Sequence, residues 1–214
     1  MNATIYANAN DGYVRSESES YATARSTGSA VESAAVGIVV ATTMESLGHH
    51  RLRFAVYRAF HSFDLSGVMG FISSAKLGIR GASFIAKNEA DAGSADLYVY
   101  EGTQADTLTT DDFNEFRSTL FGSIDYEDFS TSGYNDIPLN DSGLVYLRGK
   151  LGGNANFCFR VSGDVNNITP TGNNGMSWYS ADQAGTDADP YLYVEYVSAT
   201  GLIHHQYIPA LRGH

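Results

Sequence analysis

Hydrophobic and polar residues alternate along most of this chain, in short runs separated by residues typical of turns. In YLYVEYV (191–197), Leu192, Val194 and Tyr196 fall on one face of an extended segment and the intervening residues fall on the other. Successive side chains of a β-strand point to opposite faces, so this pattern predicts a sheet with one face on the core and one in water. The segments that predict strands are GIVVATT (37–43), RLRFAVYRAFHSF (51–63), SSAKLGIRG (73–81), ADLYVYEG (95–102), GLVYLRGK (143–150), ANFCFRV (155–161), MSWYSA (176–181) and YLYVEYV (191–197).

Short strands joined by tight turns are typical of two packed antiparallel sheets. We therefore predict an all-β fold, a single jelly-roll-like antiparallel β-sandwich. The strands over 51–63 and 73–81 are expected to be adjacent, with FDLSG (63–67) as the turn between them.

One short helix is predicted near 110–120, in LTTDDFNEFRSTLF. Thr109 or Thr110 can cap its start, and acidic residues follow in the first turn, where they favour the helix dipole. Phe113, Phe116 and Leu120 then recur at helical spacing, which predicts a buried stripe.

No repeat or linker divides the chain, so the pattern indicates one domain in three parts. Residues 1–35 form an N-terminal segment with a first strand around DGYVRSE (11–17). Residues 36–200 form the sandwich, and residues 201–214 form a C-terminal arm.

The composition supports the β prediction and limits the partners. The chain has 214 residues with 14 Tyr, 11 Phe, 22 Gly and a formal net charge of −11. Nucleic acid is not expected as a partner, because phosphate binding needs a clustered basic face. The charge also disfavours docking on anionic lipid, and the most apolar run, AAVGIVVAT (34–42), is too short to span a membrane.

The first residues lack the charged and apolar regions of a secretory signal, so we expect the chain to stay in the cytosol where it is made. The one cysteine, Cys158, lies between Phe157 and Phe159 in an apolar run. We expect it to be a buried packing residue.

Catalytic signatures are weak in this sequence. Ser73 and Lys76 have the S-x-x-K spacing of some acylating enzymes, but alternation continues through Ala75, Leu77 and Ile79. Residues three apart on a strand face opposite sides, so the amine is not expected to reach the hydroxyl. No G-x-S-x-G occurs, and GLVYLRGK lacks the spacing of a phosphate loop. A hydrolase is therefore the interpretation with the least support, and no catalytic residue is predicted.

Candidate metal ligands are equally sparse. The pairs His49–His50 and His204–His205 lack the spacing of zinc motifs and are expected to be solvated loop residues. In ADQAGTDADP, the loop residues Asp182, Asp187 and Asp189 offer oxygen ligands suited to calcium. Their spacing does not match an EF-hand, and Asp side chains that satisfy their own turn are the alternative. No cofactor is otherwise predicted.

Two segments combine aromatic residues with polar neighbours, YEDFSTSGYNDIP (126–138) and GMSWYSADQ (175–183). Aromatic rings flanked by hydrogen-bonding groups can hold a sugar. Tyr134, Trp178 and Tyr179 are therefore candidate sugar-binding residues. A lone tryptophan near a strand is more often a core residue, which is the favoured alternative for Trp178.

The C-terminal arm carries apolar residues beyond the last predicted strand. Ile203, Tyr207, Ile208 and Leu211 are candidate contacts for a partner protein. Folding back on its own domain is the alternative for this arm.

A family resemblance appears across residues 11–197. YRAFHSFDLSGV is followed by ISSAKLGIRG, DLYVYEG, LTTDDF, SGYNDIPLN, LVYLRG and YSADQAGTDADPYLYVEY, in that order. This order resembles the DNRLRE-type β-sandwich modules of bacterial and archaeal surface proteins, and especially their relatives among tailed-bacteriophage structural proteins. The run DNRLRE itself does not occur, and HRLRF (50–54) is its nearest counterpart.

The resemblance implies a structural or adhesive module without catalytic residues. It predicts an accessory virion protein of a tailed phage, a capsid decoration protein or a head or tail fibre component, assembled in the host cytoplasm. The expected partners are a phage capsid or tail protein and further copies of the chain, for example in a trimer. A carbohydrate-binding module that recognises a host surface glycan is the alternative function.

Overall fold

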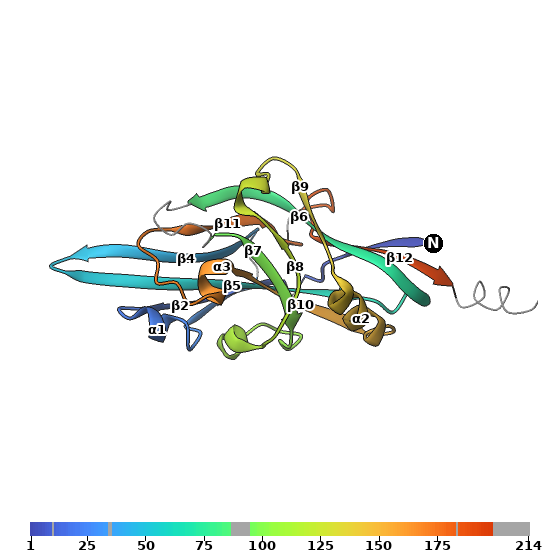
Figure 1. Cartoon of the computed structure of the whole chain (residues 1–214), viewed down its shortest axis with the longest axis horizontal. Helices are drawn as coiled ribbons and strands as arrows, with labels where there is room; N and C mark the ends of the chain where they lie inside the picture. The colour runs from blue at the N-terminus through green and yellow to red at the C-terminus, as the bar shows by residue number, and fades with distance from the viewer. Residues whose placement is uncertain (10, 34–35, 87–94, 183, 199–214) are drawn as a thin grey trace, which may run out of the picture.

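The computed structural model describes residues 1–9, 11–33, 36–86, 95–182 and 184–198. Antiparallel strands dominate this part of the chain, and they form one strongly curled sheet (Figure 1). The all-β prediction is confirmed. The strands are β1 (Asn2–Tyr6), β2 (Gly12–Ser18), β3 (Ala30–Glu32), β4 (Gly37–Gly48), β5 (Arg51–Asp64), β6 (Gly70–Ala86), β7 (Leu97–Gly102), β8 (Phe116–Ile124), β9 (Tyr134–Pro138), β10 (Asn154–Val161), β11 (Asn174–Tyr179) and β12 (Tyr191–Ser198).

Helices are short and lie at the connections. They are α1 (Tyr21–Ala24), α2 (Asp141–Gly149) and α3 (Ser162–Val165), with 3-10 turns η2 (Thr110–Asn114) and η3 (Tyr126–Asp128). In the part of the chain that the structure describes, no helix is both long and apolar enough to cross a membrane.

The sheet has the strand order β1-β12-β6-β11-β4-β5-β10-β7-β8, with β2 beside β5, β3 beside β2 and β9 beside β6. Its curl brings β9 back towards β8. The Asn140 N–H, just after β9, donates to the carbonyl of Phe121 in β8 at 2.7 Å. The sheet therefore wraps around one large core like a sandwich, and a second, smaller cluster of buried residues is separate from it. The jelly-roll strand order stays a prediction.

The large core is formed by the inward-facing apolar side chains of the curled sheet. Phe63, Phe157, Phe159 and Trp178 are at most 1% exposed and pack against one another. In β12, Leu192 and Val194 are fully buried while Tyr191 and Tyr193 point outward, as the alternation predicted.

Strands β5 and β6 are consecutive in sequence but do not pair, so the prediction that they are adjacent was wrong. β5 pairs with β4, β10 and β2, whereas β6 pairs with β12, β11 and β9. Leu65 and Val68 in the connection are buried. This connection therefore packs against the core and links two separate parts of the curled sheet. It is not a hairpin turn.

The segment 143–150 is helical, so its strand prediction was wrong. Asn140 caps the helix by accepting the Gly143 N–H on its side chain at 3.1 Å. Leu144 and Leu147 are buried while Val145 is 64% exposed, which is helical spacing. The sequence LVYLRG is so short that it fits both the two-residue period of a strand and the 3.6-residue period of a helix.

The helix predicted near 110–120 is reduced to the 3-10 turn η2. Thr109 and Asp112 form its capping box, which confirms the predicted start. The chain then extends, because the Glu115 carbonyl accepts the Thr103 N–H at 2.8 Å and β8 pairs with β7. Phe116 and Leu120 therefore belong to a strand.

The N-terminal segment is part of the sheet. The strand predicted around 11–17 is β2, and β1 was missed. β1 pairs with β12 and places Tyr6 opposite Tyr191. β1 thus supplies one side of the outer face described next.

Candidate functional site

Tyrosine side chains gather on the outer face of the four-stranded region formed by β1, β12, β6 and β9. The pairing aligns Tyr6, Tyr191, Gly78 and Asp136 in one cross-strand row. The next row on the same face contains Thr4, Tyr193, Lys76 and Pro138. Residues two apart on a strand share a face, so the alternation that buries Leu192 also exposes these side chains.

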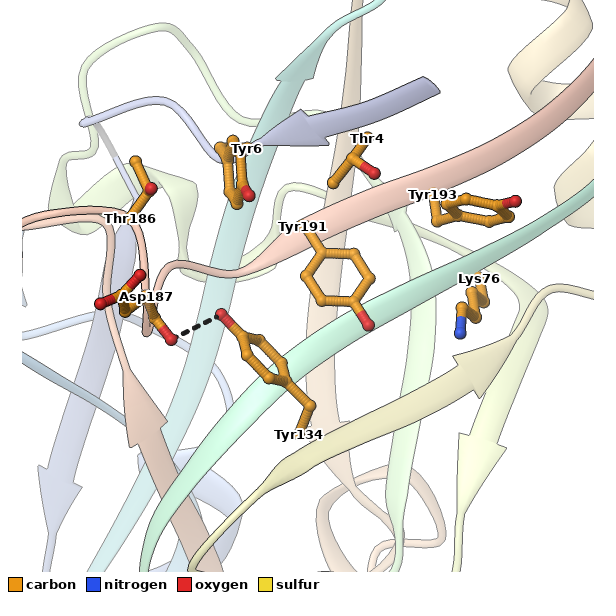
Figure 2. A pocket seen from close by; sticks show the side chains of 8 residues that line it. All are labelled: Thr4, Tyr6, Lys76, Tyr134, Thr186, Asp187, Tyr191 and Tyr193. Atoms are coloured by element: carbon orange, nitrogen blue, oxygen red, sulfur yellow. Dashed lines mark hydrogen bonds between the residues drawn. The ribbon is translucent and has the colours of Figure 1, made fainter. Parts of the chain in front are cut away.

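These two rows border a cavity of about 360 Å³. Figure 2 shows the rings of Tyr6, Tyr134, Tyr191 and Tyr193 around it. Loop 180–190 closes one side with Thr186 and Asp187. We call the set Thr4, Tyr6, Lys76, Tyr134, Thr186, Asp187, Tyr191 and Tyr193 the tyrosine cavity.

Hydrogen bonds fix two of the four rings. Tyr134 Oη donates to the carbonyl of Asp187 at 3.2 Å or of Asp189 at 3.0 Å. Tyr191 Oη donates to Asp136 Oδ1 at 2.6 Å, and its ring lies 5.0 Å from that of Tyr134. The two rings therefore present a preset aromatic wall.

Tyr6 and Tyr193 complete the aromatic lining. Tyr6 is 43% exposed. The hydroxyl of Tyr193 accepts a hydrogen bond from the Asn2 side chain at 3.1 Å and keeps its own proton available to a ligand. The cavity thus combines apolar ring faces with hydroxyl groups at their edges.

The charges at the cavity nearly cancel. Lys76 Nζ lies 2.6 Å from Asp136 Oδ2 and 5.6 Å from the centre of the Tyr193 ring. Burial alone would raise the pKa of Asp136, but hydrogen bonds from Lys76 and Tyr191 outweigh it and hold that pKa below its usual range. Burial, with the hydrogen bond to Asp136, raises the pKa of Tyr191, so the phenol stays protonated at neutral pH. The site is suited to an uncharged ligand.

The three sugar-binding candidates are separated in the structure. Tyr134 lines the tyrosine cavity. Trp178 is 0% exposed and donates its Nε1–H to His61 Nε2 at 3.0 Å. The favoured interpretation of Trp178 as a core residue is therefore confirmed, and its enclosed ring is not available to stack on a sugar. Tyr179, the last residue of β11, is half-buried and does not line this cavity.

The sequence did not single out Tyr6, Tyr191 and Tyr193. Their common signal is alternation, since each lies on the polar face of its strand. Only the pairing of β1 with β12 brings Tyr6 beside the other two.

The calcium candidates lie in one loop, and Asp187 lines the tyrosine cavity. Asp187 is exposed at the tyrosine cavity, where its carbonyl accepts from Tyr134 and from Arg80. Asp189 is buried, and Asp182 lies at the other end of the loop. Among the described side chains, no three His, Cys, Asp or Glu residues form a ready group for a metal ion.

The remaining sequence candidates have separate places. Ser73 Oγ donates to the Glu195 carbonyl, whereas Lys76 contacts Asp136, and both residues lie in the predicted strand. His49 and His50 are exposed at the tip of the β4–β5 hairpin, as predicted.

The partner-binding candidates of the C-terminal arm fall outside the described residues. They are Ile203, Tyr207, Ile208 and Leu211, and the pair His204–His205 falls there too.

A second cavity of about 460 Å³ lies between α2 and β8. Its acidic lining residues are Glu101 and Asp141, beside Phe121, Val145 and Tyr146. Two carboxylates in one cavity are what a hydrolase proposal would start from. The tyrosine cavity is the stronger candidate because its groups are held by named hydrogen bonds.

In comparisons with known proteins, no protein-family model matches this chain and no curated protein matches it significantly.

Proposed function

We propose that this protein is an accessory structural protein of a tailed-phage virion that acts by binding, without catalytic turnover. The observation that carries the proposal is the resemblance of YRAFHSFDLSGV and ISSAKL to phage structural modules. These segments belong to β5 and β6, where Phe60, Phe63 and Leu77 are at most 1% exposed. The similarity therefore concerns the framework of the fold.

An exposed apolar patch supports attachment to another protein. Met1, Met69, Phe71 and Val197 are each at least 44% exposed. Phe71 pairs directly with Val197 where β6 begins and β12 ends, next to Met1 (Figure 1). Patches of this kind are typical of interaction sites. Decoration of a capsid protein, or contact between copies in a fibre or trimer, would cover these side chains.

Immunogold electron microscopy tests this function. Antibodies against the protein are applied to tailed virions purified from cultures that carry its gene. Labelling of heads or tails supports the proposal, and virions that lack the protein by both labelling and mass spectrometry contradict it.

A deletion then tests the mode of attachment. Removing residues 201–214, or changing Phe71→Ser in the patch, should reduce binding to virions while leaving the sheet folded by circular dichroism. Leu47→Ser is the matched control, because Leu47 is also exposed and belongs to the end of β4, in the hairpin that lies at the opposite end of the molecule from the end of β12 (Figure 1).

Recognition of a host saccharide is the second candidate function, and the tyrosine cavity favours it. Aromatic faces stack on sugar rings, and the surrounding hydroxyl groups and the Lys76–Asp136 pair can hydrogen-bond to sugar hydroxyls. The nearly balanced charge favours a neutral saccharide over an anionic one.

A glycan array followed by calorimetry on any binding glycan tests this second function. Tyr6→Ala and Tyr193→Ala should each weaken binding about 10-fold, or about 1.4 kcal/mol. Tyr179→Ala is the control outside the cavity. Equal losses in all three variants, or no glycan bound by the wild type, would reject the site.

A further inference from the structure

A buried carboxylate without a cationic partner lies beneath loop 180–190. Asp11 is 1% exposed. Its Oδ2 accepts the Ala181 N–H at 3.0 Å and lies 3.1 Å from His61 Nδ1. Its Oδ1 has no hydrogen-bond partner within the described part of the chain.

The neighbouring histidine does not neutralise Asp11. Trp178 donates its indole N–H to His61 Nε2 at 3.0 Å. An indole N–H is only a donor, so Nε2 must keep its lone pair, and the ring proton belongs on Nδ1. A histidinium would carry a proton on both nitrogens and would oppose the Trp178 N–H. The hydrogen bond from Trp178 therefore leaves no place for a second ring proton on Nε2 of His61.

A second buried carboxylate also has an oxygen without a hydrogen-bond partner. Asp189 is 6% exposed, and its Oδ1 also lacks a partner among the described residues. Burial is the main cause that raises the pKa of Asp189, and the negative charge of Asp11 is the next. Burial and then Asp11 also raise the pKa of Asp182. Asp11 accepts the N–H of Ala181, the residue directly before Asp182, so its carboxylate lies against this loop.

The other buried carboxylates of the described chain are compensated. Asp164 accepts hydrogen bonds from Arg58, Arg160 and Arg25. Asp112 accepts the N–H groups of Ala105 and Thr109. Buried charges are normally paired or bound to a metal ion, so Asp11 and Asp189 stand out.

We propose that Asp11 and Asp189 bind a calcium ion, with Asp182 adding negative charge and main-chain carbonyls and water completing the ligands. Calcium fits because it takes six to eight oxygen ligands in flexible geometry and often includes carbonyls and water. Carbonyls and water can therefore supply most of the calcium ligands, and two or three carboxylates are enough. No group of three His, Cys, Asp or Glu side chains is needed, and none is formed among the described residues. Transition metals fit less well, since both nitrogens of His61 already face other groups.

The proposal changes the assignment within the loop. Asp187 is left out of the proposed ligands, since it lines the tyrosine cavity and its main-chain carbonyl accepts from Tyr134 and Arg80. Asp11 replaces it from a distant part of the sequence. An ion bound here would anchor the loop whose other side lines the cavity.

Two measurements on the full chain test the ion. After treatment with EDTA, CaCl₂ at about 100-fold excess over its Kd should raise the melting temperature by about 5 to 10 °C. MgCl₂ should raise it less, because magnesium demands stricter octahedral geometry. TbCl₃ should give luminescence sensitised by the nearby Tyr134 and Trp178, and CaCl₂ should quench it by competition.

Variants locate the site. Asp189→Asn and Asp11→Asn should each lose most of the calcium-dependent shift and the terbium signal, whereas the exposed control Asp106→Asn should keep both. If Asp11→Asn does not fold, Asp189→Asn and the wild-type titrations still decide. The proposal is overturned if CaCl₂ causes no shift, if the shift survives in Asp189→Asn, or if both variants are more stable than wild type without calcium effects. The last result would mean that the carboxyl groups are protonated in place of binding an ion.

Discussion

Arg58 donates from Nε and Nη2 to the two carboxylate oxygens of Asp164, at 2.7 and 2.8 Å, where neither side chain is more than 2% exposed. Arg160 adds a bond of 2.7 Å and Arg25 one of 3.1 Å to the same carboxylate. Arg58 also lies 4.0 Å from the centre of the Phe113 ring. Asp164 thus joins α3 to β5 and β10, and Arg58 links the cluster to η2 by donating to the Phe113 carbonyl.

Removing that acid should be strongly destabilising. Asp164→Ala leaves buried guanidinium groups without their counter-charge, so we expect a loss of about 3 to 5 kcal/mol in the free energy of unfolding. Urea denaturation followed by circular dichroism measures it. Glu19→Ala is the control, because its ion pair with Arg51 is exposed and should contribute nothing measurable. Similar losses in the two variants would show that the cluster is not a stabilising element.

The same carboxylate predicts the response to acid. Burial alone would raise the pKa of Asp164, but hydrogen bonds and charges from Arg58 and Arg160 outweigh it and hold the pKa well below its usual range. A lowered folded-state pKa contributes stability that is complete above the unfolded value, about 3.9, and is lost as pH falls towards the folded value.

Wild-type stability should therefore decline below about pH 4 as part of this contribution disappears. Urea midpoints at pH 7, 5, 4 and 3 measure the decline, and Asp164→Asn should decline less over the same window. Parallel curves for the two proteins would mean that other groups cause the acid sensitivity.

The single cysteine should be unreactive in the folded protein. Burial is the main cause that raises the pKa of the Cys158 thiol to about 12, and the residue is 0% exposed. At pH 8, a thiol reagent such as DTNB should not react with native protein but should react with one thiol per chain in urea. Rapid labelling of the native state would show that β10 opens readily.

Trp178 should report the integrity of the core. Its native fluorescence is expected to be blue-shifted and resistant to acrylamide quenching, since the ring is fully buried. Trp178→Phe removes the donor to His61 Nε2 and should cost about 1 to 3 kcal/mol, because a buried acceptor is left unpaired. Glycan binding, if present, should be unchanged in this variant. A loss of binding without a loss of stability would return Trp178 to the candidate site.

Alternation predicted much of the sheet but not its pairing. In β12, buried Leu192 and Val194 alternate with outward Tyr191 and Tyr193, and this pattern alone predicts the strand. In LVYLRG the same period of two is present by coincidence, while the decisive signal is the cap supplied by Asn140. Short segments satisfy both periods, so local pattern alone could not separate helix from strand there.

Contacts between distant parts of the chain explain why some residues of the candidate sites could not be predicted from the sequence. Tyr6 reaches the tyrosine cavity only because β1 pairs with β12, and Asp11 reaches loop 180–190 only through the same curl of the sheet. Neither residue has a local motif. Trp178 looked like a binding residue because its polar neighbours resemble a sugar site, but its partner is His61, 117 positions away.

Gly78 provides a test of the tyrosine cavity that leaves every lining side chain in place. It pairs with Tyr191 in the β6–β12 ladder, and a Cβ at position 78 would lie 2.1 Å from the Tyr191 ring. Gly78→Ala should therefore push this ring from its place beside Tyr134, at a cost of about 1 to 3 kcal/mol from overpacking. Gly67→Ala is the matched control, since nothing lies within 4 Å of its Cβ position. If the cavity is the recognition site, calorimetry should show weaker glycan binding for Gly78→Ala and unchanged binding for Gly67→Ala. Wild-type affinity in a Gly78→Ala protein whose ring has moved, judged by nuclear magnetic resonance, would place the binding site elsewhere.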